Sequence, residues 1–396
     1  MDIESAKRRV CSEVDRISSD LLDVSHKIHA NPELCFEEHF AHDLLTGILA
    51  DRDMNVKRHA YGLDTAFEAC VGDETGTNVA VICEYDGLPD MGHGCGHNVI
   101  AAAGLGAGLA AATIASEAGG RVTVVGTPAE EGGGGKEIML QRGAFADVDA
   151  AIMMHPSNEE IDDCKSLAIF QLEAEYHGKP AHASSEPYAG RNALDAAVLG
   201  YNAVAALRQH IRENERIHGI FTYAGDLPNI VPASATAEWF IRSPDLKALE
   251  LLKKRVYSCL KAGADAAGCT VDITPTNPVY AEMISNSALL ASYRNNLADL
   301  GRALNADIAA PGFLSTDMGN VSQVVPAIHP FMKIAPSEVT LHTPEFADCA
   351  VSTSGDAAVL DGAKVMAMTI VDFWLDRATQ REAEAEFEAR CNNLST

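Results

Sequence analysis

The sequence is short of basic side chains. Its 396 residues hold 30 Lys and Arg against 56 Asp and Glu, which gives a formal net charge of −26 at pH 7. This excess of negative charge repels phosphate groups. With 47% hydrophobic and 22% charged residues, the composition is that of a globular protein, and the length allows two or three domains. We therefore expect no nucleic-acid partner and no membrane partner.

Long apolar runs are also missing. No stretch approaches the roughly 20 apolar residues that cross a bilayer, and the first residues, MDIESAKRRVCSEVD, hold no apolar segment of the secretory type. These absences predict a soluble, cytoplasmic protein. The ten cysteines follow no regular spacing, so we expect reduced thiols, most of them buried, and no disulfide framework.

Hydrophobic periodicity predicts the fold class. Apolar positions between 5 and 29 recur three or four residues apart, which predicts one amphipathic helix that ends near Asn31-Pro32. Strand-like runs at 78–83, 121–126 and 150–154 then alternate with helix-like segments. This order predicts an α/β catalytic domain with a mainly parallel sheet flanked by helices, in which ligands bind at the carboxyl ends of the strands.

The middle of the chain has a different pattern. Between 167 and 274 the expected order is strand, helix, two strands, helix and strand, which is the order of an α+β ferredoxin-like unit. We therefore predict a catalytic domain in two parts, residues 1–166 and 286–396, with an inserted domain over 167–285. A long helix over 357–377 and a charged helical extension are expected to end the chain.

Residues that can bind metal ions follow three predicted strands of the first domain. The strand ends share one edge of a parallel sheet, so these residues can meet in space although they are far apart in the chain. Thiolate, imidazole and carboxylate together suit a borderline-soft divalent ion such as zinc. They are Cys95 and His97 in the loop MGHGCGHN, Glu130 and Glu131 after the second strand, and His155 after the third.

Taken singly, a Cys or a His is more often a core or surface residue than a ligand. The glycines that alternate with His93, Cys95 and His97 change this reading, because they let the loop bend tightly around one centre. Two adjacent carboxylates at a sheet edge also need a cation or a proton to offset their repulsion. Together these features favour a metal site.

The adjacent glutamates suggest a division of roles. If Glu131 binds a metal ion, Glu130 can take a proton from a water whose pKa the ion lowers, and the result is hydrolysis of an amide. A phosphate cradle at Gly132–Gly135 is the weaker alternative, because the two carboxylates repel phosphate. No GxSxG motif supports a serine nucleophile. A Cys95 nucleophile is disfavoured, because the glutamates raise the pKa of a thiol unless a metal is present.

Seven segments carry a resemblance to a known family. They run in order through most of the chain: NPELCFEE (31–38), EYDGLPDMGHGCGHN (84–98), TPAEEGGGGK (127–136), MHP (154–156), GKPAHAS (178–184), STDMGNVS (315–322) and LHTPEF (341–346). The sequence resembles the dinuclear-metal peptidase, aminoacylase and carboxypeptidase family, which is glutamate carboxypeptidase-like. Within it, the sequence is similar to the Cys-containing amidohydrolase branch close to p-aminobenzoyl-glutamate hydrolase and related dipeptidases.

The resemblance implies two divalent metal ions per subunit, with zinc favoured by the thiolate and manganese or cobalt as alternatives. The implied ligands are Cys95 as a bridge, His97 and His155 at one ion, and Glu131 and His342 at the other. The family pattern makes Glu130 the general base. Asp86 would orient His97 by accepting its free ring N–H. Many relatives have His-x-Asp at the first strand end, where this sequence has Glu84 and Asp86.

The resemblance also implies that the inserted domain is a lid and a dimerisation module. His182 would reach the active site of the neighbouring subunit in a homodimer and stabilise the tetrahedral oxyanion. Asn229 and Arg242 match positions that bind the carboxylate or carbonyl of the substrate, although Arg242 fits a surface ion pair equally well.

We therefore predict a metal-dependent amidohydrolase. Its substrate would be a small-molecule amide, either an N-acyl, aminoacyl or aminobenzoyl amino acid or a dipeptide. A catabolic aminohydrolase acting on a small aromatic amide or amine is the alternative, and a non-catalytic binding protein of the same fold is the third option. His93 is expected to make a structural hydrogen bond, and His26 and His29 to lie on a helix surface or at the rim of the site. Asp317 has no assigned step.

Overall fold

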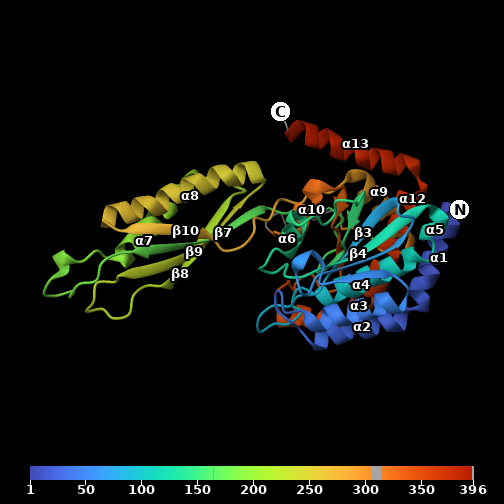
Figure 1. The fold of residues 1–396 in the computed structure, drawn as a ribbon, viewed down its shortest axis with the longest axis horizontal. Helices are drawn as coiled ribbons and strands as arrows, with labels where there is room; N and C mark the ends of the chain where they lie inside the picture. Colours follow the sequence, from blue (N-terminus) through green and yellow to red (C-terminus); the bar gives the residue numbers. More distant parts are fainter. Residues whose placement is uncertain (164, 306–313, 395–396) are drawn as a thin grey trace. The chain divides into compact units, whose positions relative to one another are not determined.

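The computed structural model describes residues 1–163, 165–305 and 314–394. The described residues form two compact units, drawn in Figure 1. Unit 1 comprises residues 1–163, 165, 283–305 and 316–394, and unit 2 comprises residues 166–282 and 314–315.

Unit 1 is built on a six-stranded sheet. The strands, in their order across the sheet, are β1 (Asn55–Arg58), β2 (Phe67–Gly72), β4 (Gly120–Thr127), β3 (Thr77–Glu84), β5 (Ala150–Ile152) and β11 (Ala327–Ile328). From β4 to β11 every pair is parallel, and β1 and β2 add an antiparallel edge. A separate parallel pair joins β6 (His155–Ser157) to β12 (Phe331–Lys333).

Helices complete unit 1. They are α1 (Ile3–Arg16), α2 (Ser18–Ala30), α3 (His39–Asp51), η1 (Ala60–Gly62), α4 (His97–Ala112), α5 (Ala115–Ala118), α6 (Gly135–Gln141), α9 (Ser287–Asp299), α10 (Met318–Val324), α11 (Pro344–Cys349), α12 (Thr353–Leu375) and α13 (Arg377–Leu394). The order β3-α4-β4-α6-β5 confirms the predicted α/β class with a mainly parallel sheet.

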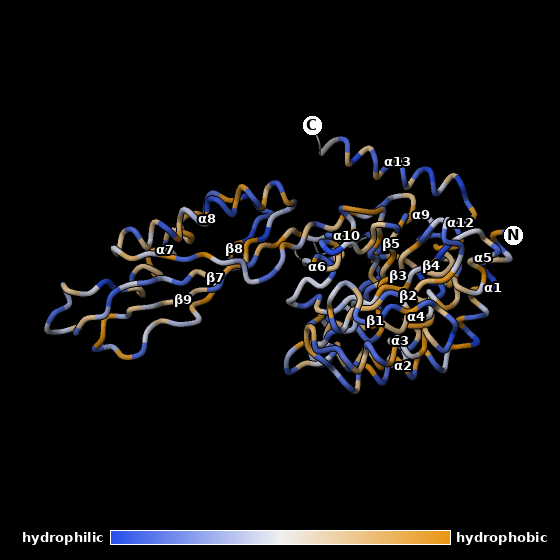
Figure 2. The backbone as a smooth tube through the Cα atoms, in the orientation of Figure 1, coloured by the Kyte–Doolittle hydropathy of each residue, from blue (hydrophilic) through white to orange (hydrophobic). Residues whose placement is uncertain are grey.

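Strand β3 shows why the sheet is covered on both faces. Successive side chains of a strand point to opposite faces. Val79, Val81 and Cys83 accordingly join the core that includes α4 and α12, whereas Ala80 and Ile82 join a second core with residues of α6 and α10. Figure 2 shows these strands as hydrophobic segments inside unit 1 and α13 as a largely hydrophilic helix.

Two expectations for unit 1 need correction. The single helix predicted over 5–29 is two helices, because Ile17 leaves helical geometry with φ −100° and ψ 10°. Periodicity does not detect this break, since Ile17 is buried like the helix positions around it. The antiparallel edge strand β1 was not expected, because its residues, NVKR, are mostly polar and exposed and give no apolar alternation.

Unit 2 has the predicted order of elements. It contains β7 (Ala168–His177), η2 (Pro187–Ala189), α7 (Ala193–Leu207), η3 (Arg208–His210), β8 (Arg216–Tyr223), β9 (Ser234–Ser243), α8 (Leu246–Ala267) and β10 (Thr270–Pro275). The antiparallel sheet has the order β10-β7-β9-β8. Along β9, alternate residues are buried, as expected for a strand with one face against α7 and α8.

None of the described helices is long and apolar enough to cross a membrane. Each cysteine that the structure describes is a free thiol.

Close packing between α4 and β3 makes glycine necessary at position 104. A Cβ added there would lie 2.7 Å from the carbonyl oxygen of Ile82 and 2.8 Å from Cys83 Sγ, whereas one added at Gly47 in α3 would meet no atom within 4 Å. We expect Gly104→Ala to lower the free energy of unfolding by about 1–3 kcal/mol through overpacking. The matched control Gly47→Ala should raise it by about 0.5–1 kcal/mol. Urea unfolding measures the stability of both variants. Equal changes in the two would contradict the close packing of α4 against β3 at position 104.

Candidate metal centre

Three strand ends of unit 1 bring ligand-type side chains together. β3 ends at Glu84, β4 ends at Thr127 just before the two glutamates, and β5 ends at Ile152, three residues before His155. Gly96, with φ 76°, turns the chain so that His97 is the first residue of α4. Glycine adopts this left-handed conformation without strain, so the loop can direct the side chains of Cys95 and His97 toward the same site.

The first ligand group consists of Cys95, His97 and His155, whose ligand atoms all lie within 4.8 Å of one another. Cys95 Sγ lies 3.6 Å from His155 Nε2. His155 Nδ1 lies 2.6 Å from the carbonyl oxygen of Pro156, and His97 Nδ1 lies 3.0 Å from Asp86 Oδ1. Each Nδ1 therefore carries a proton that it donates, which leaves each Nε2 available as a ligand.

The second group consists of Cys95, Glu131 and His342. His342 Nε2 lies 3.4 Å from Cys95 Sγ and 3.6 Å from Glu131 Oε1. The backbone of His342 is left-handed, with φ 62°, and its N–H donates to the carbonyl oxygen of Gly94 at 2.9 Å. This contact attaches the His342 segment to the loop that carries Cys95.

A third group, Glu84, His97 and Glu130, lies beside the first. Glu84 Oε1 is 3.1 Å from His97 Nε2, but the two atoms do not have hydrogen-bond geometry. Glu84 was expected as a ligand-type residue at the first strand end that replaces the histidine of many relatives, and it was not predicted as a metal ligand. The strand-end position of Glu84 was visible in the sequence, but its distance to His97 was not.

A buried lysine joins this third group to Asp317. Lys136 is fully buried, and its ammonium contacts Glu84 Oε2 and lies 2.6 Å from Asp317 Oδ1. The backbone N–H of Lys136 also donates to Asp317 Oδ2 at 2.9 Å. Lys136 was not predicted as a site residue, because glycines and glutamates dominate its motif and Asp317 lies 181 residues away.

Crowded carboxylates shift the protonation of the site. Burial and repulsion from Glu84 raise the pKa of Glu130 well above its usual range, and burial also raises the pKa of Glu131. Burial raises the pKa of the Cys95 thiol, and Glu131 raises it further. Burial opposes ionisation of Asp86, but attraction to His97 holds its pKa at about 2. The site therefore favours bound cations or protons.

The donor set fits divalent ions. Atoms bound to one tetrahedral zinc at about 2.0–2.3 Å lie roughly 3.3–3.8 Å apart. The separations of Cys95 Sγ from His155 and His342, and of His342 from Glu131, fall in this range. Three buried atoms of these ligand groups also lack a hydrogen-bond partner among the described residues. They are Glu84 Oε1, His97 Nε2 and Glu131 Oε1. Buried polar atoms are nearly always paired, and bound divalent ions would give these three atoms partners.

Unit 2 separates the other predicted site residues. The N–H of Ala183 donates to the carbonyl oxygen of Asn229 at 3.0 Å, so His182 and Asn229 lie on neighbouring segments beyond the start of β9. Arg242 lies near the other end of β9, where its Nη1 donates to Ser315 Oγ at 2.8 Å. The structure thus brings His182 and Asn229 together and places Arg242 apart from them.

The chain matches peptidase family M20/M25/M40 over residues 59–372. It belongs to this family. It is 38% identical to the Xaa-Arg dipeptidase of Mus musculus, over 98% of this chain and 94% of the relative. It is 28% identical to one of the subunits of p-aminobenzoyl-glutamate hydrolase from Escherichia coli, over 92% of this chain and 91% of the relative.

Two solved structures share the fold of this M20 peptidase. The aminobenzoyl-glutamate utilization protein from Klebsiella pneumoniae matches with a TM-score of 0.75 at 17% identity, over 93% of this chain and 99% of the other. A dinuclear metal-binding peptidase of the M20 family from Bacillus subtilis matches with a TM-score of 0.68 at 18% identity, over 90% and 99%. The expected family and the prediction of a metal-dependent amidohydrolase are confirmed.

Other histidines of the M20 peptidase have structural partners. His93 Nε2 lies 3.1 Å from the carbonyl oxygen of Ile28, as expected for a structural hydrogen bond. His26 Nε2 lies 2.7 Å from Asp356 Oδ1 on the surface, and His29 Nε2 lies 2.9 Å from the carbonyl oxygen of Ala347.

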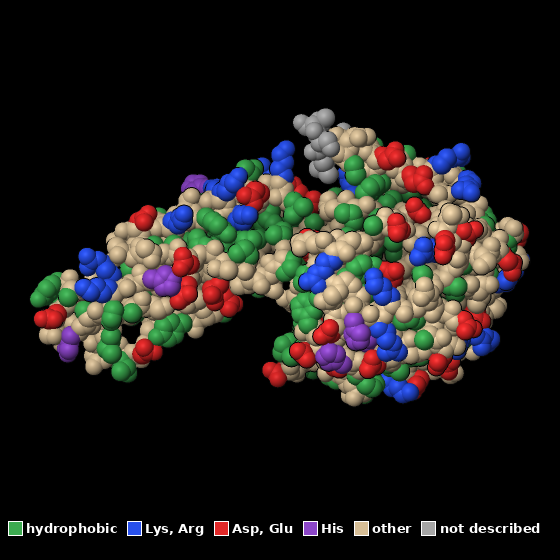
Figure 3. All heavy atoms as spheres, in the orientation of Figure 1, with side chains coloured by type: hydrophobic (Ala, Val, Ile, Leu, Met, Phe, Trp, Pro, Cys, Tyr) green, Lys and Arg blue, Asp and Glu red, His purple; other side chains and the backbone are tan. Residues whose placement is uncertain are grey.

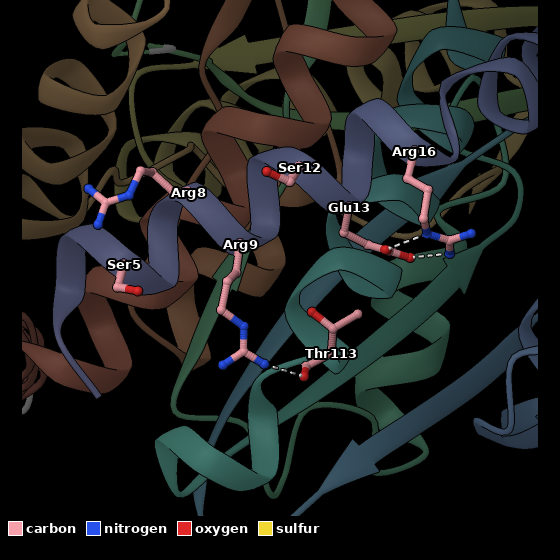
Figure 4. Close-up of a pocket in the computed structure, with 7 residues that line it drawn as sticks. All are labelled: Ser5, Arg8, Arg9, Ser12, Glu13, Arg16 and Thr113. Atoms are coloured by element: carbon pink, nitrogen blue, oxygen red, sulfur yellow. Dashed lines mark hydrogen bonds and ion pairs between the residues drawn. The ribbon is translucent and has the colours of Figure 1, made fainter.

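A surface hollow of about 440 Å³ beside α1 is lined by arginines (Figure 4). Two of its three arginines have acidic partners, because Arg9 pairs with Glu117 at 2.7 Å and Arg16 pairs with Glu13 at 2.6 Å. Exposed ion pairs of this kind contribute little to stability.

The buried Lys136 offers a test of the charge network. In Lys136→Met, Glu84 and Asp317 lose their buried counter-charge, so we expect the free energy of unfolding to fall by about 3–5 kcal/mol. The control Lys27→Met breaks an exposed pair with Asp23, whose side chains are 51% and 58% exposed, and should cost less than about 1 kcal/mol. Urea unfolding measures both, and a Lys136→Met loss no larger than that of the control would rule out the network.

Proposed function

We propose that this chain hydrolyses the amide bond of a dipeptide or a related N-acyl or aminobenzoyl amino acid, with dipeptides ending in arginine as the first candidates. One observation carries the proposal: Glu130 lies in a ligand group next to the two groups that share Cys95. The activities for which the relatives are named support this substrate class. The net charge of −26 also favours a cationic substrate over an anionic one.

Two divalent ions would be held by the first two ligand groups, with Cys95 between them. When bound, they would polarise the substrate carbonyl and lower the pKa of a water molecule toward neutrality. We propose zinc as the resident ion, because a thiolate with imidazoles suits it best, and manganese or cobalt as alternatives.

Glu130 is the proposed general base. It is only 9% exposed, and its carboxylate shares a group with His97 and Glu84. In this role it takes the proton of the attacking water and passes it to the leaving nitrogen of the amide. Asp86 supports the step by holding the ring N–H of His97 and, through its second oxygen at 3.0 Å, the backbone N–H of Glu131.

His182 is the proposed donor to the tetrahedral oxyanion. Its Nδ1 accepts from the backbone N–H groups of Ser184 and Ser185, each at 3.3 Å. The proton of the neutral ring therefore lies on Nε2, on an exposed side chain. This tautomer supplies the N–H that oxyanion stabilisation requires.

Geometry within unit 2 favours a shared active site. β9 runs from Ser234, near Asn229 and His182, to beyond Arg242, and its pleat separates these ends by roughly 26 Å at about 3.3 Å per residue. A dipeptide is much shorter than this distance. If His182, Asn229 and Arg242 all contact one substrate, two copies of the chain must contribute them.

Strand β8 supplies a surface for such a homodimer. It lies at one edge of the four-stranded sheet, where its backbone groups are open to pairing. Ile220 is 63% exposed and Tyr223 is 40% exposed, and Val198 and Leu199 of the neighbouring α7 are similarly exposed. On the face of unit 2 visible in Figure 3, hydrophobic side chains lie among the charged ones. An edge strand with apolar side chains suits pairing with a second copy.

Replacement of the proposed base tests the function. Glu130→Gln keeps the size of the side chain but cannot take a proton, so we expect kcat to fall by about 10²–10⁴-fold while the bound metal stays near the wild-type amount. The assay uses Xaa-Arg dipeptides, aminobenzoyl-glutamate and N-acyl amino acids, and elemental analysis gives the metal content.

Glu345→Gln, an exposed change three residues after His342, is the matched control and should retain activity. Retained turnover in Glu130→Gln would exclude Glu130 as the base. Wild-type protein that binds no divalent ion and cleaves no member of the panel would refute the proposed function.

Mixed variants test the shared site. Glu130→Gln and His182→Ala are each expected to be inactive, but after subunit exchange a mixed dimer has one complete site, so about a quarter of the wild-type activity should return. No recovery in mixed dimers would show that His182 acts within its own chain.

Subunit contact is checked separately by sedimentation. Ile220→Glu on β8 should dissociate the dimer and prevent recovery. Leu251→Glu on α8, where the leucine is 58% exposed, should leave both the dimer and the recovery of activity unchanged.

A further inference from the structure

Glu38 is a buried carboxylate close to the proposed metal centre that none of the steps above uses. It precedes α3 and is fully buried, and its side chain does not cap that helix. Instead it accepts three hydrogen bonds. Oε1 accepts from the backbone N–H of Phe36 at 3.0 Å and of Ala129 at 2.9 Å, and Oε2 accepts from Thr65 Oγ1 at 2.7 Å.

Two of these donors have left-handed backbones. Phe36 has φ 65° and Ala129 has φ 60°. A residue with a Cβ loses about 1–2 kcal/mol in this conformation and keeps it only where surrounding contacts impose it. A single oxygen atom of Glu38 binds both N–H groups, so it stabilises both strained residues at once.

Ala129 directly precedes Glu130 and Glu131. Its carbonyl oxygen accepts from the N–H groups of Gly133 at 3.0 Å and Gly134 at 2.8 Å, which closes a turn after β4. A Cβ on Gly133 would overlap the ring of Phe36, so the Phe36 segment also packs against this turn.

Two buried carboxylates therefore hold the backbone on either side of Glu130. Glu38 binds the N–H of Ala129, and Asp86 Oδ2 binds the N–H of Glu131 at 3.0 Å. With both N–H groups held, the direction of the Glu130 and Glu131 side chains depends on contacts outside the turn.

We propose that Glu38 is a positioning residue that sets the Ala129 backbone and, through it, the placement of Glu130 and Glu131. This role rests on the proposed function only where it is tested by enzymatic activity. Glu38 acts as a hydrogen-bond acceptor of the right length, and its charge is secondary. Burial raises the pKa of Glu38 to about 7, with repulsion from Asp86 adding to the shift, so a neutral side chain is tolerated there.

Length and charge can be separated by two substitutions. Glu38→Gln keeps an oxygen that reaches Phe36 and Ala129, and should retain kcat and metal affinity within about threefold of wild type. Glu38→Asp keeps the charge but is one methylene shorter. It should lower kcat with little change in KM, and weaken binding of the Glu131 ion, by about 10–100-fold.

Thr65→Val is the matched control, because it removes one hydrogen bond of Glu38 without touching the Ala129 contact. It should behave like Glu38→Gln. Zinc titration measures affinity, and hydrogen exchange by mass spectrometry follows the peptide that contains Ala129, whose protection should fall only in Glu38→Asp. The exchange readout needs neither substrate nor metal, so it separates failure of this role from failure of the proposed function.

Wild-type exchange and zinc affinity in folded Glu38→Asp would overturn the proposal. Equal losses in Glu38→Gln and Glu38→Asp would also overturn it, because the variant that keeps a full-length acceptor would then fare no better than the shortened one.

Discussion

The centre of unit 1 depends on the repulsion between carboxylates that the sheet brings to one edge. Glu84, Glu130 and Glu131 lie at the ends of adjacent strands, and Lys136 is the buried cation that contacts Glu84. Burial strengthens repulsion between like charges, and bound divalent ions offset it. The negative charge that destabilises this edge of the sheet therefore favours the binding of cations.

Left-handed backbone turns this edge into a defined set of ligands. Gly96, Ala129 and His342 each have a positive φ and each stands at or next to a ligand-type residue. Only Gly96 adopts this geometry without strain, so Ala129 and His342 need outside contacts, which Glu38 and Gly94 provide. Rigid backbone at these positions holds ligand atoms apart at the spacing that a metal ion needs.

Unit 2 carries a different part of the proposed chemistry. Its ferredoxin-like sheet is long enough to keep His182 and Asn229 far from Arg242, and its edge strand β8 exposes apolar side chains. An arrangement of this kind links catalysis to association, because a site completed by a second chain works only in the assembled protein. In the proposed reaction the metal ligands come from unit 1 alone.

The sequence by itself determined the alternation of strands and helices in unit 1, the six-element order of unit 2, and the strand-end motifs that place Cys95, His97, Glu131 and His155 at one edge. These features are local or periodic, so they are visible in a few residues. Only the tertiary structure decided the break at Ile17, the contacts of Lys136 with Asp317, and those of Glu38 with Ala129. Such contacts join residues far apart in the chain, and no spacing rule encodes which distant partner a buried charge will meet.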